Sequence, residues 1–176
     1  VLALGDDGGY FDLGAEFGKA LGKLSAFSIT TDVFIPETTD TARNGNFIWC
    51  FAHSSSAGYL FYSAKGQRYA ITKTNYAGEE GLKARATMTP KLGRWFNLAV
   101  VMRPNGRVYL NINGSGAGVA KVSITPADLN ELVNNYLGRS CYAGDQPLKG
   151  AMYHNFKLWN YDISSKELAA IRNDAT

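Results

Sequence analysis

Residues 94–114 read RWFNLAVVMRPNGRVYLNING, and they carry the clearest structural signal in the chain. Trp95–Arg103 is an apolar run of strand length, and residues 104–106 after it (Pro-Asn-Gly) are types that favour a tight turn. In Arg107–Ile112 every second residue is aliphatic, which is the pattern of a strand with one buried and one exposed face. The stretch therefore predicts an antiparallel β-hairpin.

The same period-two pattern extends outward from this hairpin in both directions. Polar or glycine-rich segments at residues 37–45, 74–81 and 113–118 separate the apolar runs and are expected to be loops. About ten strands at short spacing, without helices alternating between them, predict an all-β antiparallel two-sheet sandwich. Further strands are predicted at Tyr10–Leu13, Phe27–Ile35, Asn46–Ala52, Gly58–Ser63, Gln67–Thr72, Leu82–Thr89 and Val119–Ile124.

Two short helices are expected to interrupt the strands. Thr125 is placed to cap a helix that begins at Pro126, because proline is favoured at the first helical position. Ser164 and Glu167 have the spacing of a capping box, in which the hydroxyl and the carboxylate satisfy free backbone N–H groups. The second helix is expected to pack onto the sandwich through Leu168.

The composition is that of one folded domain spanning residues 1–176. Hydrophobic residues make up 45% of the chain, charged residues make up 19%, and the net charge is only +3. So small a positive charge, scattered along the chain, argues against nucleic-acid binding. No apolar stretch approaches the roughly 20 residues of a membrane-spanning helix, so no membrane span is predicted.

The chain has two cysteines, Cys50 and Cys141, which do not form a metal-binding or redox motif by their spacing. Cys50 lies in the apolar strand Asn46–Ala52, and this placement predicts a buried free thiol. A disulfide between the two is the alternative for an oxidising compartment.

Three segments occur in an order that resembles the laminin-G-like domains of the concanavalin A-like lectin and glucanase group. They are the hairpin above, Tyr136–Ser140 with Gly150 after it, and Phe156–Tyr161 followed by the Ser164 capping box. The resemblance implies a jelly roll of two antiparallel sheets, one of them concave. Tyr153, His154 and Asn155 stand where the family has acidic residues, which is a departure from its pattern.

The family is functionally broad, so the resemblance implies a range of functions. Its members bind sugars, proteins or calcium, and many are attached to bacterial glycoside hydrolases. The resemblance therefore implies a secreted, periplasmic or cell-surface location and an adjacent catalytic domain as a partner. Within the fold, Trp95 and Trp159 are expected to fill the core.

Catalytic residues are not indicated by the sequence. Glucanases of this fold need carboxylates at alternating positions on one strand face, and no such pattern occurs. Glu79 and Glu80 are adjacent, so their side chains are expected to point apart in a solvated loop. There is also no G-x-S-x-G nucleophile motif. The sequence therefore favours a binding module over an enzyme.

Calcium is a candidate ligand because carboxylates gather near the start of the chain and in one late loop. Asp12, close to Asp6 and Asp7, and Asp145, in the loop 140–150, are the candidate ligands. The alternative is that these aspartates simply favour turns.

Carbohydrate is the sharper prediction, with a sugar ring stacked on aromatic side chains and its hydroxyls bonded by polar groups. Tyr76 and Tyr142 lie in predicted loops, and Arg139, Asp145 and His53 are the candidate polar contacts. The alternatives are that these aromatics are ordinary core and strand residues and that His53 lies beside a turn in which serine hydroxyls bond the backbone. The alternative function is a structural or protein-interaction module that positions an adjacent glycoside hydrolase domain.

Overall fold

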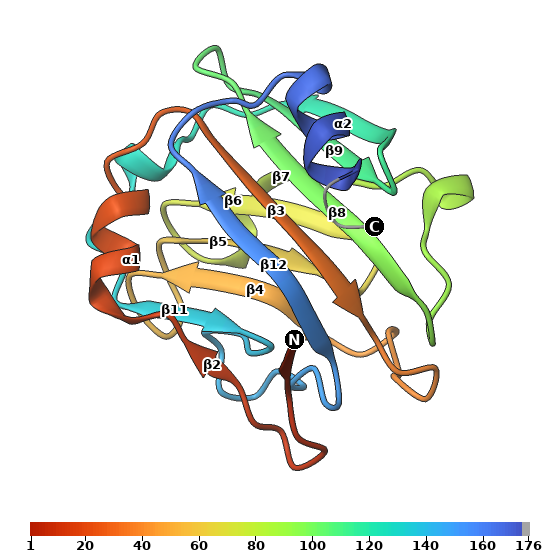
Figure 1. Ribbon diagram of the computed structural model, residues 1–176. Coiled ribbons are helices and arrows are strands. Elements are labelled where there is room, and N and C mark those ends of the chain that lie inside the picture. The colour runs from red at the N-terminus through yellow and green to blue at the C-terminus, as the bar shows by residue number, and fades with distance from the viewer. Residues whose placement is uncertain (174–176) are drawn as a thin grey trace.

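The computed structural model describes residues 1–173, with side chains described as far as Ile171. Two antiparallel sheets of six strands each lie face to face (Figure 1). The first, here the β3 sheet, has the order β1 (Leu2–Ala3), β12 (Met152–Trp159), β3 (Phe27–Phe34), β8 (Trp95–Met102), β9 (Arg107–Ile112) and β10 (Ser115–Lys121). The second, here the β5 sheet, has the order β2 (Phe11–Asp12), β11 (Asn134–Leu137), β4 (Phe47–Ala52), β5 (Tyr59–Ser63), β6 (Arg68–Thr72) and β7 (Glu80–Lys83). The predicted all-β jelly-roll sandwich is confirmed.

The core lies between the two sheets and is built by the alternation seen in the sequence. In β9 the aliphatic residues Val108, Leu110 and Ile112 are buried, while Arg107 is exposed. Across the interior, the β5 sheet contributes large side chains such as Trp49, which is fully buried. Burial of each such side chain contributes roughly 1.5–3 kcal/mol to folding, so this layer is the main source of stability.

The outer face of the β5 sheet is also largely buried. Strands β4 and β5 are buried at every position, so both of their faces are covered. The outward side chains form a second apolar cluster, with Tyr142 from the loop after β11 packed against it. The members of this cluster are Phe47, Cys50, Ala52, Tyr59, Phe61, Ala70 and Cys141.

Two helices pack against the sandwich (Figure 1). Helix α1 (Gly14–Leu21) packs on β11, and helix α2 (Ser165–Asn173) covers the outer face of the β3 sheet beside β8. The predicted capping box of α2 is confirmed, because the Glu167 carboxylate accepts from Ser164 N at 2.7 Å. Helix α1 was not predicted, since its eight residues include two glycines and only a short apolar stripe. None of the described helices is long and apolar enough to cross a membrane.

The hairpin after β9 corrects one sequence prediction. Residues 113–118 were expected to be a loop and Val119–Ile124 a strand, whereas β10 already begins at Ser115. Asn113 and Gly114 both have positive φ, at 51° and 76°, which is the geometry of a two-residue turn that joins antiparallel strands. Ser115 therefore pairs directly with Ile112.

Four further predictions, for one strand, one helix and two tryptophans, need correction. The strand Leu82–Thr89 ends at Lys83, because the chain then leaves the sheet: Arg85 N donates to Ala117 O of β10, and the 3₁₀ turn η2 (Ala86–Met88) follows. The helix expected at Thr125 is only one 3₁₀ turn, η3 (Pro126–Asp128). Trp95 is not in the core: it is 45% exposed and packs beside Phe34. Trp159 is half-buried beside the α2 contact rather than between the sheets.

Candidate functional site

The candidate site is a groove of about 760 Å³ on the outer face of the β5 sheet. Its floor is aromatic: the rings of Phe47 and Phe61 are stacked with their centroids 4.2 Å apart. The Arg68 guanidinium lies 4.9 Å above the centre of the Phe61 ring. These three side chains come from adjacent strands and alternate outward, so the sheet itself fixes their spacing. The groove is lined by Asn44, Gly45, Phe47, Phe61, Ser63, Lys65, Gly66, Arg68, Tyr76, Glu79, Lys83, Tyr142 and Asp145.

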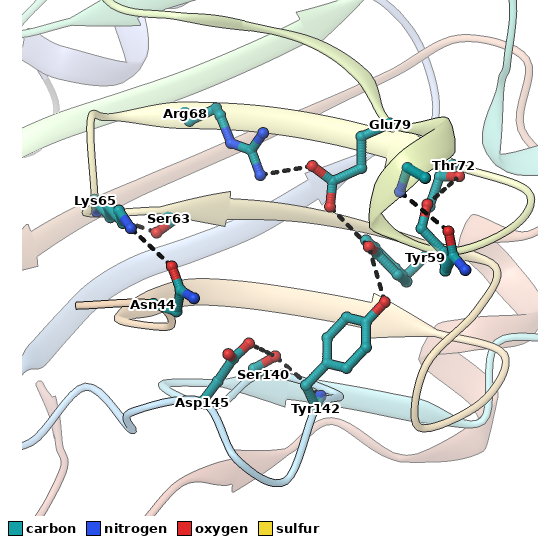
Figure 2. Close-up of polar contacts among 12 residues, drawn as sticks. Asn44, Tyr59, Ser63, Lys65, Arg68, Thr72, Glu79, Ser140, Tyr142 and Asp145 are labelled. Carbon is teal, nitrogen blue, oxygen red and sulfur yellow. Dashed lines mark hydrogen bonds and ion pairs between the residues drawn. The ribbon is translucent and has the colours of Figure 1, made fainter. Parts of the chain in front are cut away.

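One wall is the connection between β6 and β7, which is held in place by Glu79 (Figure 2). The Glu79 carboxylate accepts hydrogen bonds from Tyr59 Oη at 2.7 Å and from Arg68 at 2.6 Å. The 3₁₀ turn η1 (Tyr76–Gly78) precedes Glu79 and is capped by the Asn75 side chain, which accepts from Ala77 N. This arrangement presents Tyr76 to solvent, with 73% of its surface exposed.

The opposite wall is the loop after β11, centred on Tyr142. Tyr142 Oη donates to the carbonyl of Ser56 at 2.9 Å and lies 3.3 Å from Tyr59 Oη. Ser140 Oγ donates to the Asp145 carboxylate at 2.6 Å and accepts from Tyr142 N at 3.0 Å. Figure 2 shows Tyr142 and Asp145 facing the groove across from Arg68 and Glu79.

The rim of the groove is mixed in charge, with a small positive excess. Lys65, Arg68 and Lys83 line it together with two carboxylates, Glu79 and Asp145. Arg68 is neutralised by Glu79, and Lys65 Nζ donates to Asn44 Oδ1 at 2.7 Å. Within residues 1–171, neither lysine of the rim forms a salt bridge. The rim thus offers ammonium donors, a carboxamide and carboxylate acceptors.

The phenol of Tyr59 stays neutral beneath the groove. Burial raises its pKa above the usual range, and the neighbouring Tyr142 and Glu79 side chains raise it further. A neutral phenol keeps its proton, so Tyr59 is a permanent hydrogen-bond donor to Glu79.

A second hollow of about 990 Å³ adjoins the groove, and Asn44 and Asp145 line both. It has no aromatic side chain in its lining, which is polar and charged apart from two prolines and a glycine. The two depressions share a border, so together they form a longer surface with an aromatic part and a polar part. The second hollow is lined by Asp6, Pro36, Thr38, Thr39, Asp40, Arg43, Asn44, Gly144, Asp145, Gln146, Pro147 and Lys149.

The structure brings three of the predicted site residues together, since Tyr76, Tyr142 and Asp145 all line the groove. Two others lie elsewhere. Arg139 packs over the ring of Tyr10, with its guanidinium 4.6 Å from the ring centre. His53 Nδ1 is within hydrogen-bond distance, 2.8 Å, of the Glu131 carbonyl.

Sequence reasoning missed the floor of the groove. Arg68 carries a signal that could have found it, because it is the one charged residue of β6 and a charged side chain is expected to point away from the core. Phe61 carries no such signal, because β5 is apolar on both faces. Asn44, Lys65 and Glu79 join the site from loops, where no periodic pattern exists.

Neither predicted metal ligand is part of a carboxylate cluster. Asp12 accepts a hydrogen bond from Gly14 N at 2.8 Å, and Asp145 accepts from Ser140. Across the described part of the chain, no group of three or more His, Cys, Asp or Glu side chains is close enough to hold a metal ion. Calcium prefers about six to eight oxygen ligands, so these two residues do not fit it by themselves.

Comparisons with known proteins agree with this architecture. A laminin-G family model, described as the concanavalin A-like lectin/glucanases superfamily, matches residues 6–169. A search of curated proteins gives no match. Among solved structures, the chain is similar to the CBM40 module of the Ruminococcus gnavus IT-sialidase, bound to α2,3-sialyllactose, with a TM-score of 0.72 and 15% identity over 97% of this chain and 94% of that one.

Two larger structures contain the same fold. The binding domain of botulinum neurotoxin serotype D/C has a TM-score of 0.71 and 13% identity, and the match covers 99% of this chain and 43% of that one. The NanB sialidase from Streptococcus pneumoniae has a TM-score of 0.71 and 14% identity, with 96% of this chain and 27% of that one covered. From the family match over nearly its whole length and the observed two-sheet jelly roll, the chain belongs to the concanavalin A-like lectin/glucanases superfamily.

Proposed function

We propose that this domain is a non-catalytic carbohydrate-binding module and that its site is the groove on the β5 sheet. The observation that carries the proposal is an exposed tyrosine, Tyr76, beside a groove with an aromatic floor and a rim of carboxamide, ammonium and carboxylate groups. Sugars present an apolar C–H face, which stacks on aromatic rings, and hydroxyls, which bond to polar groups. Binding sites for small ligands are usually concave surfaces that combine aromatic side chains with a small number of well-placed polar groups.

The two depressions support an oligosaccharide rather than a single sugar as the ligand. One sugar unit would lie against Tyr76, and the oligosaccharide would continue past Asn44 and Asp145 into the polar hollow. The CBM40 module from R. gnavus was solved with a sialyllactose, a short oligosaccharide that carries a carboxylate. Since Lys65 and Lys83 give the rim a positive excess, acidic oligosaccharides are the first class to test.

The carboxylates in the groove are already engaged, which supports binding rather than hydrolysis. Glu79 is paired with Arg68, and Asp145 accepts from Ser140. Glycoside hydrolysis requires one carboxyl group to act as acid and the other as base or nucleophile. We also propose that the module is exported and works beside a catalytic domain, since the similar CBM40 module belongs to a sialidase.

The test is a glycan-array screen of the purified domain, with and without a calcium chelator, repeated with Tyr76→Ala. Saturable binding that falls at least about tenfold in Tyr76→Ala is expected, because loss of an aromatic hot spot costs about 1.4 kcal/mol or more. Tyr161→Ala is the matched control, since Tyr161 is 40% exposed and follows β12, on the other sheet. It is expected to bind as the parent does.

Two results would contradict the proposal. Binding that Tyr76→Ala leaves unchanged would place the sugar elsewhere on the domain. A folded domain that binds no glycan in either buffer would favour the structural role, in which the module positions a neighbouring enzyme domain. Loss of binding with the chelator would reopen calcium as a ligand.

A further inference from the structure

The two cysteines lie together beneath one wall of the groove. Cys50 is fully buried on the outward face of β4, and Cys141 is 6% exposed in the loop after β11. Both belong to the same buried apolar cluster on the outer face of the β5 sheet. Their thiols are free in this structure. Two cysteines that are far apart in the sequence therefore lie in the same buried cluster.

Cys141 sits in the middle of the segment that forms the Tyr142 wall. Ser140, the residue before it, bonds to Asp145, and Tyr142, the residue after it, contacts Ser56 and Tyr59. Cys50 belongs to a central strand that is paired on both sides, with β11 and β5. A covalent link between the two would join a surface loop to a central strand of the sheet.

We propose that Cys50 and Cys141 form an intramolecular disulfide in the presence of a disulfide oxidant, and that this bond anchors the Tyr142 wall. The reaction is thiol–disulfide exchange. The thiolate of Cys141 attacks the oxidant, breaks its S–S bond and releases one reduced thiol. The thiolate of Cys50 then attacks Cys141 Sγ and releases the second thiol. Two cysteine thiols lose two protons and two electrons, and the oxidant is reduced to two thiols.

The local environment sets the order and the speed of these steps. Cys141 has the residual exposure, so it meets the oxidant first. Burial raises the pKa of the Cys50 thiol well above its usual range, and the contact with Cys141 raises it further. Because the thiolate is the nucleophile, the second step is slow in the folded domain and faster while the chain folds.

The bond itself is tested by refolding the reduced domain with oxidised glutathione. A mass loss of two hydrogens is expected, with no thiol reactive to maleimide after denaturation, against two in the reduced domain. The midpoint of thermal unfolding is expected to rise by roughly 5–15 °C, because the link closes a long loop in the unfolded chain. Cys50→Ala and Cys141→Ala should each lack this mass loss and this rise. Two reactive thiols after oxidation, or a lasting glutathione adduct on Cys141, would overturn the proposal.

The anchoring is tested separately by amide hydrogen exchange in the oxidised and reduced domains. Amides of residues 140–146 are expected to exchange at least about tenfold more slowly after oxidation, while those of the Asn113–Gly114 turn, on the other sheet, keep their rates. Equal rates at residues 140–146 in both forms would overturn the anchoring, even with the bond formed. Neither measurement involves a sugar, so failure of the proposed carbohydrate function would leave both results interpretable.

Discussion

The phenol of Tyr59 donates a 2.7 Å hydrogen bond to the carboxylate of Glu79, and this bond joins strand β5 beneath the groove to the β6–β7 wall. Tyr59 is fully buried in β5, whereas Glu79 follows the turn that carries Tyr76. The same carboxylate accepts from Arg68 of β6. One side chain therefore ties two strands to the turn, and the position of exposed Tyr76 depends on it.

Glu79→Gln is expected to lower the free energy of unfolding by about 2 kcal/mol, because Arg68 loses a largely buried charge partner. The Glu79 side chain is only 10% exposed. Urea unfolding of the variant and of Glu16→Gln measures the difference. Glu16 pairs with Lys19 at the surface with 88% exposure, so its variant is expected to change stability by less than about 0.5 kcal/mol. Equal decreases in the free energy of unfolding for the two variants would contradict the prediction, because they would show that water screens the Glu79–Arg68 pair as much as the Glu16–Lys19 pair.

Gly18→Ala is expected to destabilise the domain by about 3 kcal/mol, although alanine is the better helix former. A Cβ at Gly18 would overlap the carbonyl oxygen of Leu132, where helix α1 packs beside β11. Gly116→Ala is the control, because a Cβ there meets no atom within 4 Å. Thermal unfolding compares the two variants. If Gly18→Ala unfolds at the same temperature as the parent protein, α1 does not approach the Leu132 carbonyl this closely.

Stability is expected to fall steeply once the pH rises above about 10, the pKa of an exposed tyrosine. Burial raises the pKa of several phenols above this range, so the folded domain keeps protons that the unfolded chain releases, and unfolding is favoured as pH rises. Phenolate absorbance followed with circular dichroism measures this. Four of the ten tyrosines should ionise only as the fold is lost; their ionisation in a native fold would contradict the assignment. They are Tyr59, Tyr62, Tyr69 and Tyr153.

Longer oligosaccharides are expected to bind at least about tenfold more tightly than the single sugar at their end, because they also fill the polar hollow. Arg43→Ala removes a side chain that lines only this hollow, so it should weaken binding of the long ligand and leave the short one unchanged. Tyr76→Ala should weaken both. Calorimetric titration of the two variants with both ligands separates the depressions. Equal affinities for short and long ligands would confine the site to the aromatic groove.

The alternation of polar and apolar residues predicted the strands of the sheets but not the turns and strand ends that connect them. The alternation in Arg107–Ile112 was enough to assign a strand and its buried face. Prediction from alternation failed where the backbone conformation did not follow the alternation of polar and apolar residues. The turn at Asn113 and Gly114 converted an expected loop into β10, and the chain after Lys83 left the sheet although its alternation continued.

The jelly-roll architecture and the family follow from the amino-acid sequence, because alternation, turns and the motif order are local properties of the chain. The position of the site depends instead on tertiary contacts. Phe61 and Cys50 are apolar residues on strands that are apolar on both faces, so their outward direction is not visible in the pattern. Asp145 and Arg68 come from distant segments and line the same groove only after the β5 sheet has formed, since their proximity depends on strand order and not on sequence spacing.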